Sequence, residues 1–137
     1  MIRTRFKNVL LVAPDIFPDQ LLSDYKNVKH ISAVSSIFPS LYTFNPEMII
    51  LDFDYLGNDL EKVLRRIMAN KFYSKLKVCC YKKSPHTKVD SFLRALGVDM
   101  IVYQEDILKA EKSKTILSNF SAILDVSILK WAGSVSN

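Results

Sequence analysis

Glycine is scarce in this chain: only three of its 137 residues are glycine, namely Gly57, Gly97 and Gly133. Enzymes that hold nucleotides through a phosphate-binding loop need several closely spaced glycines, because the backbone must approach the phosphate groups. The three glycines lie far apart and form no such loop. A dinucleotide-dependent enzyme is therefore excluded, and the main motif of other nucleotide-binding enzymes is missing.

Cysteine and histidine are also rare, with two residues of each. Cys79 and Cys80 are adjacent in an apolar run, where their side chains point to opposite faces of a strand, and no second cysteine pair or nearby histidine completes a metal set. They are typical of small core residues in a reducing compartment. His30 and His86 are isolated, and surface or capping roles are expected for them. The sequence predicts no catalytic residue, no metal site and no enzymatic activity.

Long apolar runs are missing as well, since no stretch approaches the roughly 20 residues that a membrane-spanning helix needs. Residues 1–7 lead into a short apolar stretch without the small-residue cleavage site of a secretory signal. With 49% hydrophobic and 24% charged residues, the composition is typical of a folded globular protein. We therefore expect one cytoplasmic domain over residues 1–137 that does not bind membranes.

The formal net charge of +5 comes from basic residues that are scattered along the chain. They fall on several predicted elements rather than in one stripe, among them Lys7, Lys26, Lys29, Lys62, Arg65, Arg66, Lys71 and Lys75. A solvated surface explains this distribution better than a nucleic-acid footprint does. A basic nucleic-acid-binding accessory domain stays open as an alternative.

Short apolar runs predict five strands, at residues 9–12, 28–34, 48–51, 77–81 and 100–103. The third run is wholly apolar, as expected of a strand buried on both faces of a parallel sheet. The second run mixes polar and apolar residues and predicts an edge strand.

Helical spacing of apolar residues follows each strand. The first helix is predicted from Phe17, Leu21, Leu22 and Tyr25, and the second from Ile37, Phe38, Leu41, Tyr42 and Phe44 after a cap at Ser35-Ser36. The third begins after Asn58, with Glu61 three residues later, and buries Leu60, Val63, Leu64, Ile67 and Met68. The fourth begins at Ser84-Pro85, buries Val89, Phe92, Leu93 and Leu96, and stops at Gly97. The last begins within 106–115.

Five alternating strands and helices predict an α/β fold with a doubly wound parallel sheet. In such sheets the functional loops lie beyond the carboxyl ends of the strands. Polar residues at those ends are Asp15, Asp52, Asp54, Lys82, Lys83, Gln104 and Glu105.

The order of these elements resembles the receiver domain of two-component response regulators over about residues 7–125. The best local match is the segment 46–52, which ends in Asp52, followed by Gly57; the segment 95–99 before the last strand is a secondary match. The resemblance implies a flavodoxin-like (βα)5 three-layer sandwich whose five parallel strands have the order 2-1-3-4-5. Residues 125–133 would extend the C-terminal helix.

The resemblance also implies a site. In the family, an acidic pair after the first strand and a phosphorylated Asp after the third hold Mg²⁺, while a hydroxyl after the fourth strand and a Lys after the fifth contact the phosphoryl group. Asp52 occupies the phosphoacceptor position, but the other positions align with Ala13 and Pro14, Lys82 and Gln104. Ile101 stands where the family has an aromatic residue.

The predicted pocket is therefore degenerate. Loss of the acidic pair removes most ligands of an octahedral, oxygen-preferring ion. Asp15 and Asp54 lie nearby in sequence and would replace the missing pair only in part. Two placements of Lys82 stay open: an ion pair with Asp52 that would lower the proton affinity of that carboxylate, or a side chain in solvent.

These residues predict an atypical receiver, or pseudo-receiver, that acts in signalling through protein–protein contacts without aspartyl phosphorylation. The alternative is a receiver phosphorylated at Asp52, and only that reading requires a cofactor, Mg²⁺. The expected partner is a signalling protein. A homodimer through the fourth helix, the fifth strand and the last helix is a candidate assembly, with Tyr103, Ile128 and Trp131 as candidate contact residues. The sequence leaves open whether the chain is a whole protein or a first domain.

Overall fold

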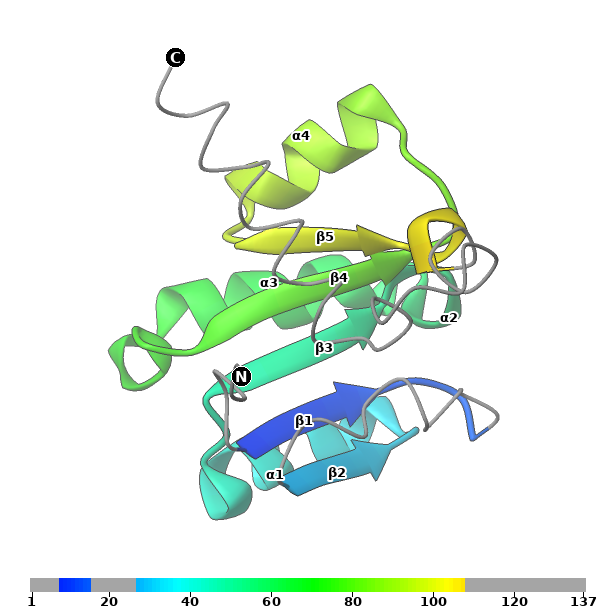
Figure 1. Cartoon of the computed structure of the whole chain (residues 1–137). Coiled ribbons are helices and arrows are strands. Elements are labelled where there is room, and N and C mark those ends of the chain that lie inside the picture. Colours follow the sequence, from blue (N-terminus) through cyan, green and yellow to red (C-terminus); the bar gives the residue numbers. More distant parts are fainter. Residues whose placement is uncertain (1–7, 16–26, 108–137) are drawn as a thin grey trace, which may run out of the picture.

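The computed structural model of the protein describes residues 8–15 and 27–107. At its centre lies a five-stranded parallel sheet with the order β2-β1-β3-β4-β5 (Figure 1). The strands are β1 (Asn8–Val12), β2 (Asn27–Ile31), β3 (Met48–Asp52), β4 (Lys77–Lys82) and β5 (Met100–Tyr103). The strand order expected from the resemblance is confirmed, and so is the α/β class.

The burial of the strands agrees with their positions in the sheet. Every residue of β3 is buried between β1 and β4, whereas β2 at the edge has no fully buried residue. The predicted second strand was too long, because the chain leaves the sheet after Ile31 and forms a 3-10 turn, η2 (Val34–Ser36).

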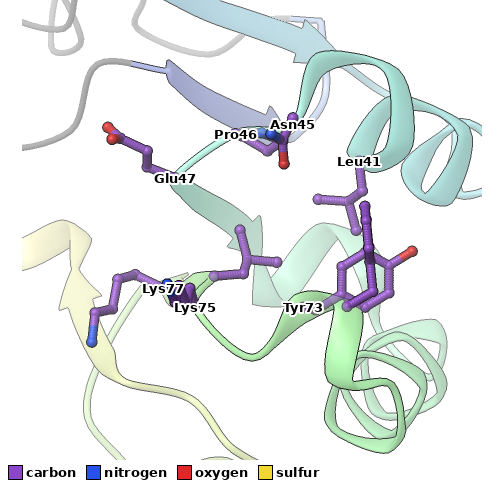
Figure 2. A pocket seen from close by; sticks show the side chains of 9 residues that line it. Leu41, Asn45, Pro46, Glu47, Tyr73, Lys75 and Lys77 are labelled. Carbon is purple, nitrogen blue, oxygen red and sulfur yellow. The ribbon is translucent and has the colours of Figure 1, made fainter.

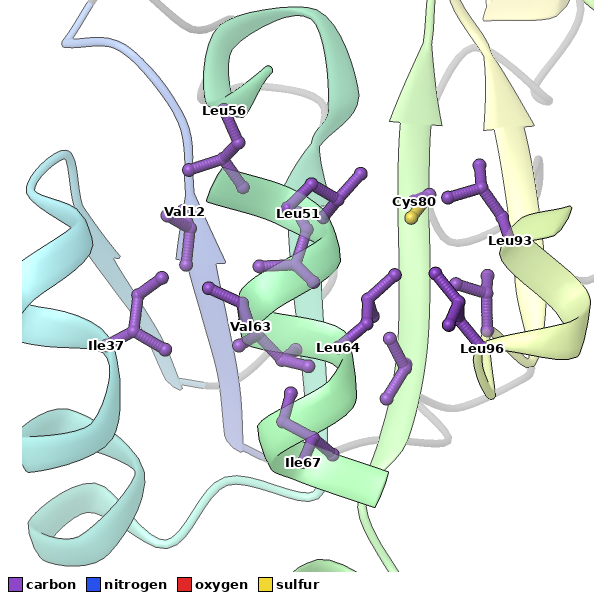
Figure 3. Packing of buried hydrophobic residues seen from close by; sticks show 14 of the residues in the cluster. Val12, Ile37, Leu51, Leu56, Val63, Leu64, Ile67, Cys80, Leu93 and Leu96 are labelled. Carbon is purple, nitrogen blue, oxygen red and sulfur yellow. The ribbon is translucent and has the colours of Figure 1, made fainter. Parts of the chain in front are cut away.

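The longer described helices pack against one face of the sheet. They are α1 (Ile37–Phe44), α3 (Asp59–Ala69) and α4 (Thr87–Ala95), while α2 (Phe53–Leu56) is a short helix after β3 and η3 (Lys71–Tyr73) a 3-10 turn before β4. Figure 3 shows Val63, Leu64 and Ile67 of α3 facing the strands, with Leu93 of α4 beside Cys80. Alternate strand residues form the second buried cluster, on the opposite face: for example, Leu10 belongs to the helix-covered cluster and Leu11 to the other.

Several sequence-based expectations for the helix ends and faces were wrong. The side chain of Asn58 makes no capping bond to α3, and α4 begins after His86 rather than at Ser84. Nδ1 of His86 accepts a hydrogen bond from the backbone N–H of Val89 at 3.3 Å, so the capping role expected for this histidine is confirmed. Met68 and Phe92 were expected in the core but are 61% and 46% exposed.

The ends of α1 and α4 follow local backbone chemistry. α1 ends at Asn45, which has a left-handed φ of 49° before Pro46, and asparagine tolerates this conformation better than most residues do. Gly97 follows α4 with a φ of 100°, in agreement with the predicted stop.

Two predicted segments lie outside the described residues. These are the helix expected around Phe17 and most of the last helix, including Ile128 and Trp131. Residues 104–107 are helical, two residues before the predicted start of that last helix. In the described part of the chain, no helix has both the length and the apolar character needed to cross a bilayer.

Candidate functional site

The carboxyl ends of the strands bring the predicted site residues to one edge of the sheet. β3 ends at Asp52, which pairs with Tyr81 of β4, and Lys82 at the end of β4 pairs with Tyr103 of β5. The arrowheads in Figure 1 mark this edge, which α2 adjoins.

Asp52 is largely withdrawn from solvent and is used as a helix cap. It is 8% exposed, and its Oδ1 accepts a hydrogen bond of 3.1 Å from the backbone N–H of Tyr55 in α2. Burial raises the pKa of Asp52 above its ordinary value, against the opposing effect of the Tyr55 hydrogen bond, and the nearby charge of Asp54 raises it further. This carboxyl group therefore holds its proton more tightly than a free aspartate does.

The other acidic residues of the predicted pocket are on the surface. Asp54 is exposed, and its Oδ2 accepts a hydrogen bond of 3.2 Å from the backbone N–H of Lys83, which joins α2 to the loop after β4. Asp15 is exposed as well. Over residues 8–15 and 27–107, no three or more His, Cys, Asp and Glu side chains are grouped in a way that could hold a metal ion.

The two residues that align with the family's acidic pair, Ala13 and Pro14, are packed against the rest of the protein. Ala13 is buried in a core cluster and Pro14 is half-buried. The carbonyl oxygens of both residues lie 3.1 Å from Nε2 of His30 in β2. Because a carbonyl oxygen only accepts, Nε2 of His30 is the donor in these contacts.

Lys82 is neither paired with Asp52 nor exposed to solvent, so both placements considered from the sequence were wrong. Its ammonium Nζ lies 2.5 Å from Oδ1 of Asp90 in α4, and the two side chains are only 5% and 7% exposed. The same Nζ lies 4.8 Å from the centre of the Phe53 ring. Asp52 thus has no ion pair with Lys82, and the smaller effect of the nearby Lys83 charge, which lowers the pKa of Asp52, does not offset its burial.

Asp90 is the centre of a buried polar network. Its Oδ2 accepts hydrogen bonds from the hydroxyl of Tyr103 at 2.6 Å and from the backbone N–H of His86 at 3.3 Å. Burial alone would raise the pKa of Asp90, but the hydrogen bonds from Lys82 and Tyr103 outweigh it and hold the pKa below the ordinary value. Burial and the carboxylate of Asp90 raise the pKa of Tyr103. The network ties α4 to the ends of β4 and β5.

Comparison with solved structures identifies this architecture. The signal receiver domain of the DNA-binding response regulator MerR from Colwellia psychrerythraea 34H superposes with a TM-score of 0.61, at 17% identity, over 79% of this chain and 96% of its own. The chain has the receiver fold. A response regulator in red light signaling of R. palustris superposes with a TM-score of 0.64, at 16% identity, over 82% of this chain and 95% of its own. No protein-family model and no curated protein matches the sequence.

The three other residues that the sequence analysis singled out, Gln104, Ile101 and Tyr103, are half-buried or buried. Gln104, at the position of the family's lysine, is half-buried in the first helical residue after β5. Ile101, at the position of the family's aromatic residue, is 5% exposed and packs in the helix-covered cluster. Tyr103 was proposed as a surface contact, yet it is half-buried and its hydroxyl is bonded to Asp90.

Sequence reasoning missed Asp90, the residue that determines where Lys82 goes. A signal was present: Asp90 follows Val89 and precedes Leu93 by three residues, which places it beside the apolar stripe of α4. Because a lysine at the carboxyl end of the preceding strand is near the start of this helix, an acid at that position was a candidate partner.

Proposed function

We propose that this protein is an atypical receiver that acts in signalling by binding another protein, without phosphorylation of Asp52 and without catalysis. The observation that carries the proposal is the buried pair of Lys82 and Asp90. The receiver family places a hydroxyl group for the phosphoryl group at the position of Lys82. Here that position holds a cation that already has a buried carboxylate partner.

The chemistry of phosphoryl transfer supports the same reading. A carboxylate accepts a phosphoryl group when cations neutralise the charge that develops on its oxygens, and Mg²⁺ takes oxygen ligands for this purpose. Ala13 and Pro14 provide no carboxylate at the positions of the family's acidic pair. The Asp52 carboxyl already accepts the Tyr55 hydrogen bond, and its burial raises its pKa above the ordinary value.

In this proposal the partner contacts a surface whose conformation is fixed rather than switched. Phe92 of α4 is 46% exposed, and the Lys82–Asp90–Tyr103 network holds its helix against β4 and β5. A buried network of hydrogen bonds favours one arrangement of the elements that it joins. The face of α4 and β5 is thus a constitutive binding surface, for a signalling protein or for a second copy of the chain.

Incubation with acetyl phosphate and Mg²⁺ tests the proposal. Intact-protein mass spectrometry should show no phosphoryl adduct, while a phosphorylatable receiver treated in parallel gains one. A stoichiometric adduct on the wild type that is lost in Asp52→Asn would establish the alternative, a receiver that is phosphorylated at Asp52.

A further inference from the structure

A group of aromatic side chains, two of them exposed and two half-buried, lies where α1 meets η3. We call it the aromatic strip: Phe38 and Tyr42 of α1 with Phe72 and Tyr73 of η3. The ring centres of Phe38 and Tyr73 are 5.9 Å apart, those of Phe72 and Tyr73 are 5.2 Å apart, and those of Tyr42 and Phe72 are 6.1 Å apart. Tyr42 is 72% exposed and Phe72 is 58% exposed, although Tyr42 was expected in the core. Adjacent exposed aromatic rings are typical of a contact surface.

The part of the strip that η3 provides lines an open pocket of about 460 Å³. Phe72 and Tyr73 line it together with the aliphatic side chains of Leu41 and Leu76 and with Pro46. In Figure 2, Leu41 and Tyr73 lie at one end of this pocket. The apolar end is suited to an inserted aliphatic or aromatic side chain.

The opposite end of the pocket is charged. Lys75, Lys77 and Glu47 line it there, and all three are exposed (Figure 2). Lys71, also exposed, lies beside Phe72 in η3. The basic residues outnumber the acidic one, so the rim attracts a negatively charged ligand.

This pocket is separate from the edge that carries Asp52. Residues 45–47 lead into β3, and residues 75–76 lead into β4. In a parallel sheet the amino ends of the strands lie at the edge opposite to their carboxyl ends. The pocket therefore belongs to neither the degenerate phosphoacceptor site nor the polar network of α4.

We propose that the aromatic strip and its pocket bind an acidic peptide segment of a partner protein, which inserts one aliphatic or aromatic side chain between Leu41 and Tyr73. The inference rests on the proposed function as a binding module and adds to it a second binding surface, apart from the face of α4 and β5, together with the chemistry of the partner segment that it binds. Acidic side chains of the peptide pair with Lys75 and Lys77, while its apolar side chain fills the opposite end of the pocket.

The geometry of the rings favours a peptide over a single-stranded nucleic acid. Stacking of bases requires free ring faces. The guanidinium of Arg66 covers the Phe38 ring at 3.9 Å from its centre, and Phe72 meets Tyr73 edge-on at 79°. Glu47 on the rim also disfavours a continuous run of phosphates.

Selection from a phage-displayed random peptide library on the immobilised wild-type protein tests the inference. We expect the enriched peptides to combine two or more acidic residues with a neighbouring Leu, Ile, Phe or Trp. The affinity of one enriched synthetic peptide, measured by fluorescence anisotropy, should fall roughly tenfold or more in Phe72→Ser and in Lys75→Glu/Lys77→Glu.

Matched variants on α4 serve as controls, since Phe92 is an exposed aromatic residue and Lys88 an exposed lysine. Phe92→Ser and Lys88→Glu should leave the affinity for the peptide unchanged. All substituted side chains are exposed, and circular dichroism should show the same melting temperature within a few degrees.

Four results would overturn the inference. Peptides that lose affinity in Phe92→Ser but not in Phe72→Ser would retain the proposed function, with the face of α4 and β5 as the peptide-binding surface, and would rule out the pocket beside η3. Failure to enrich acidic peptides would remove the proposed partner chemistry. If the wild type binds a labelled single-stranded oligonucleotide tightly and Phe72→Ser does not, the pocket binds nucleic acid. If the wild type sediments as a dimer and Phe72→Ser as a monomer, the pocket binds a second copy of the chain.

Discussion

The ammonium group of Lys82 and the carboxylate of Asp90 form an ion pair of 2.5 Å that is more than nine-tenths buried. The pair connects the end of β4 to the first turns of α4, and the hydroxyl of Tyr103 adds β5 to it. Two charges taken out of water are expensive, and they persist in a fold only when each satisfies the other. The lysine at the carboxyl end of β4 thus has a structural role.

Removal of the lysine should destabilise the protein strongly. Lys82→Met leaves the Asp90 carboxylate buried without its cation, and such losses cost about 3–5 kcal/mol. Urea unfolding followed by circular dichroism measures the change. The neighbouring Lys83→Met is the matched control, since Lys83 is exposed and its substitution should change the stability by less than about 0.5 kcal/mol. A loss below about 1 kcal/mol in Lys82→Met would contradict the role given to the pair.

The double variant Lys82→Met/Asp90→Leu separates the loss of the ion pair from the cost of an unpaired charge. Apolar replacement of both partners is often neutral, whereas removal of one partner is not. We therefore expect the double variant to be more stable than Lys82→Met alone, by denaturant unfolding. If the loss of stability in the double variant equals the sum of the losses in Lys82→Met and in Asp90→Leu, the two residues do not interact.

Asp90 should also make the stability sensitive to acid. Its pKa in the folded protein lies below the ordinary 3.8, so its contribution is present above pH 3.8 and is lost as the pH falls through the folded pKa. Thermal unfolding from about pH 6 down to about pH 2 should show a shallower acid decline in Asp90→Asn than in the wild type. If the stability of the two proteins falls equally with pH, a carboxylate other than Asp90 determines the sensitivity to acid.

Asp52 should behave in the opposite sense. Its raised folded pKa means that its stabilising contribution is complete below pH 3.8 and is lost as the pH rises through the folded pKa, where ionisation of the buried carboxyl costs free energy. Asp52→Asn keeps the oxygen that accepts the Tyr55 hydrogen bond and has no charge. It should therefore match or exceed the stability of the wild type at neutral pH, and this advantage should disappear in acid.

Asp52→Ala is the control for the cap. It removes both the charge and the acceptor, and loss of an N-cap costs about 1 kcal/mol. Denaturant unfolding at neutral pH should thus place Asp52→Ala below Asp52→Asn. Equal stabilities of the two variants would show that the cap of α2 is unimportant.

The two thiols should be protected from reagents. Cys79 and Cys80 are fully buried, and burial raises the pKa of both, that of Cys80 to about 12. Since the thiolate is the reactive form, Ellman's reagent should react slowly with the native protein and promptly with two thiols in denaturant. Rapid labelling without denaturant would contradict the burial of this strand.

The sequence predicted the layout of the sheet but not the polar contacts at its edge. The wholly apolar run that became β3 and the mixed run that became β2 gave their positions, because burial on one or two faces determines which residues a strand can contain. The partner of Lys82 depended on the rotation of α4, which brings Asp90 inward. Helical spacing alone could not show whether Asp90 or Asp52 is the ion-pair partner of Lys82.

The aromatic residues show a second limit. Phe38, Tyr42 and Phe44 fit one helical face, and that spacing predicted burial for all of them. Tyr42 is instead 72% exposed, since the ring that it meets in η3, Phe72, is itself 58% exposed and does not cover it. A short 3-10 turn such as η3 has no periodic pattern from which its position could be predicted.

The most direct test of the account is an amide NMR spectrum of the protein with and without Mg²⁺ and beryllofluoride, a phosphoryl mimic that requires a competent carboxylate and metal site. The account predicts an unchanged spectrum, with Lys82 still paired to Asp90, and the same result for Asp52→Asn. Widespread shifts centred on Asp52 in the wild type that vanish in Asp52→Asn would contradict it and restore the phosphorylation switch.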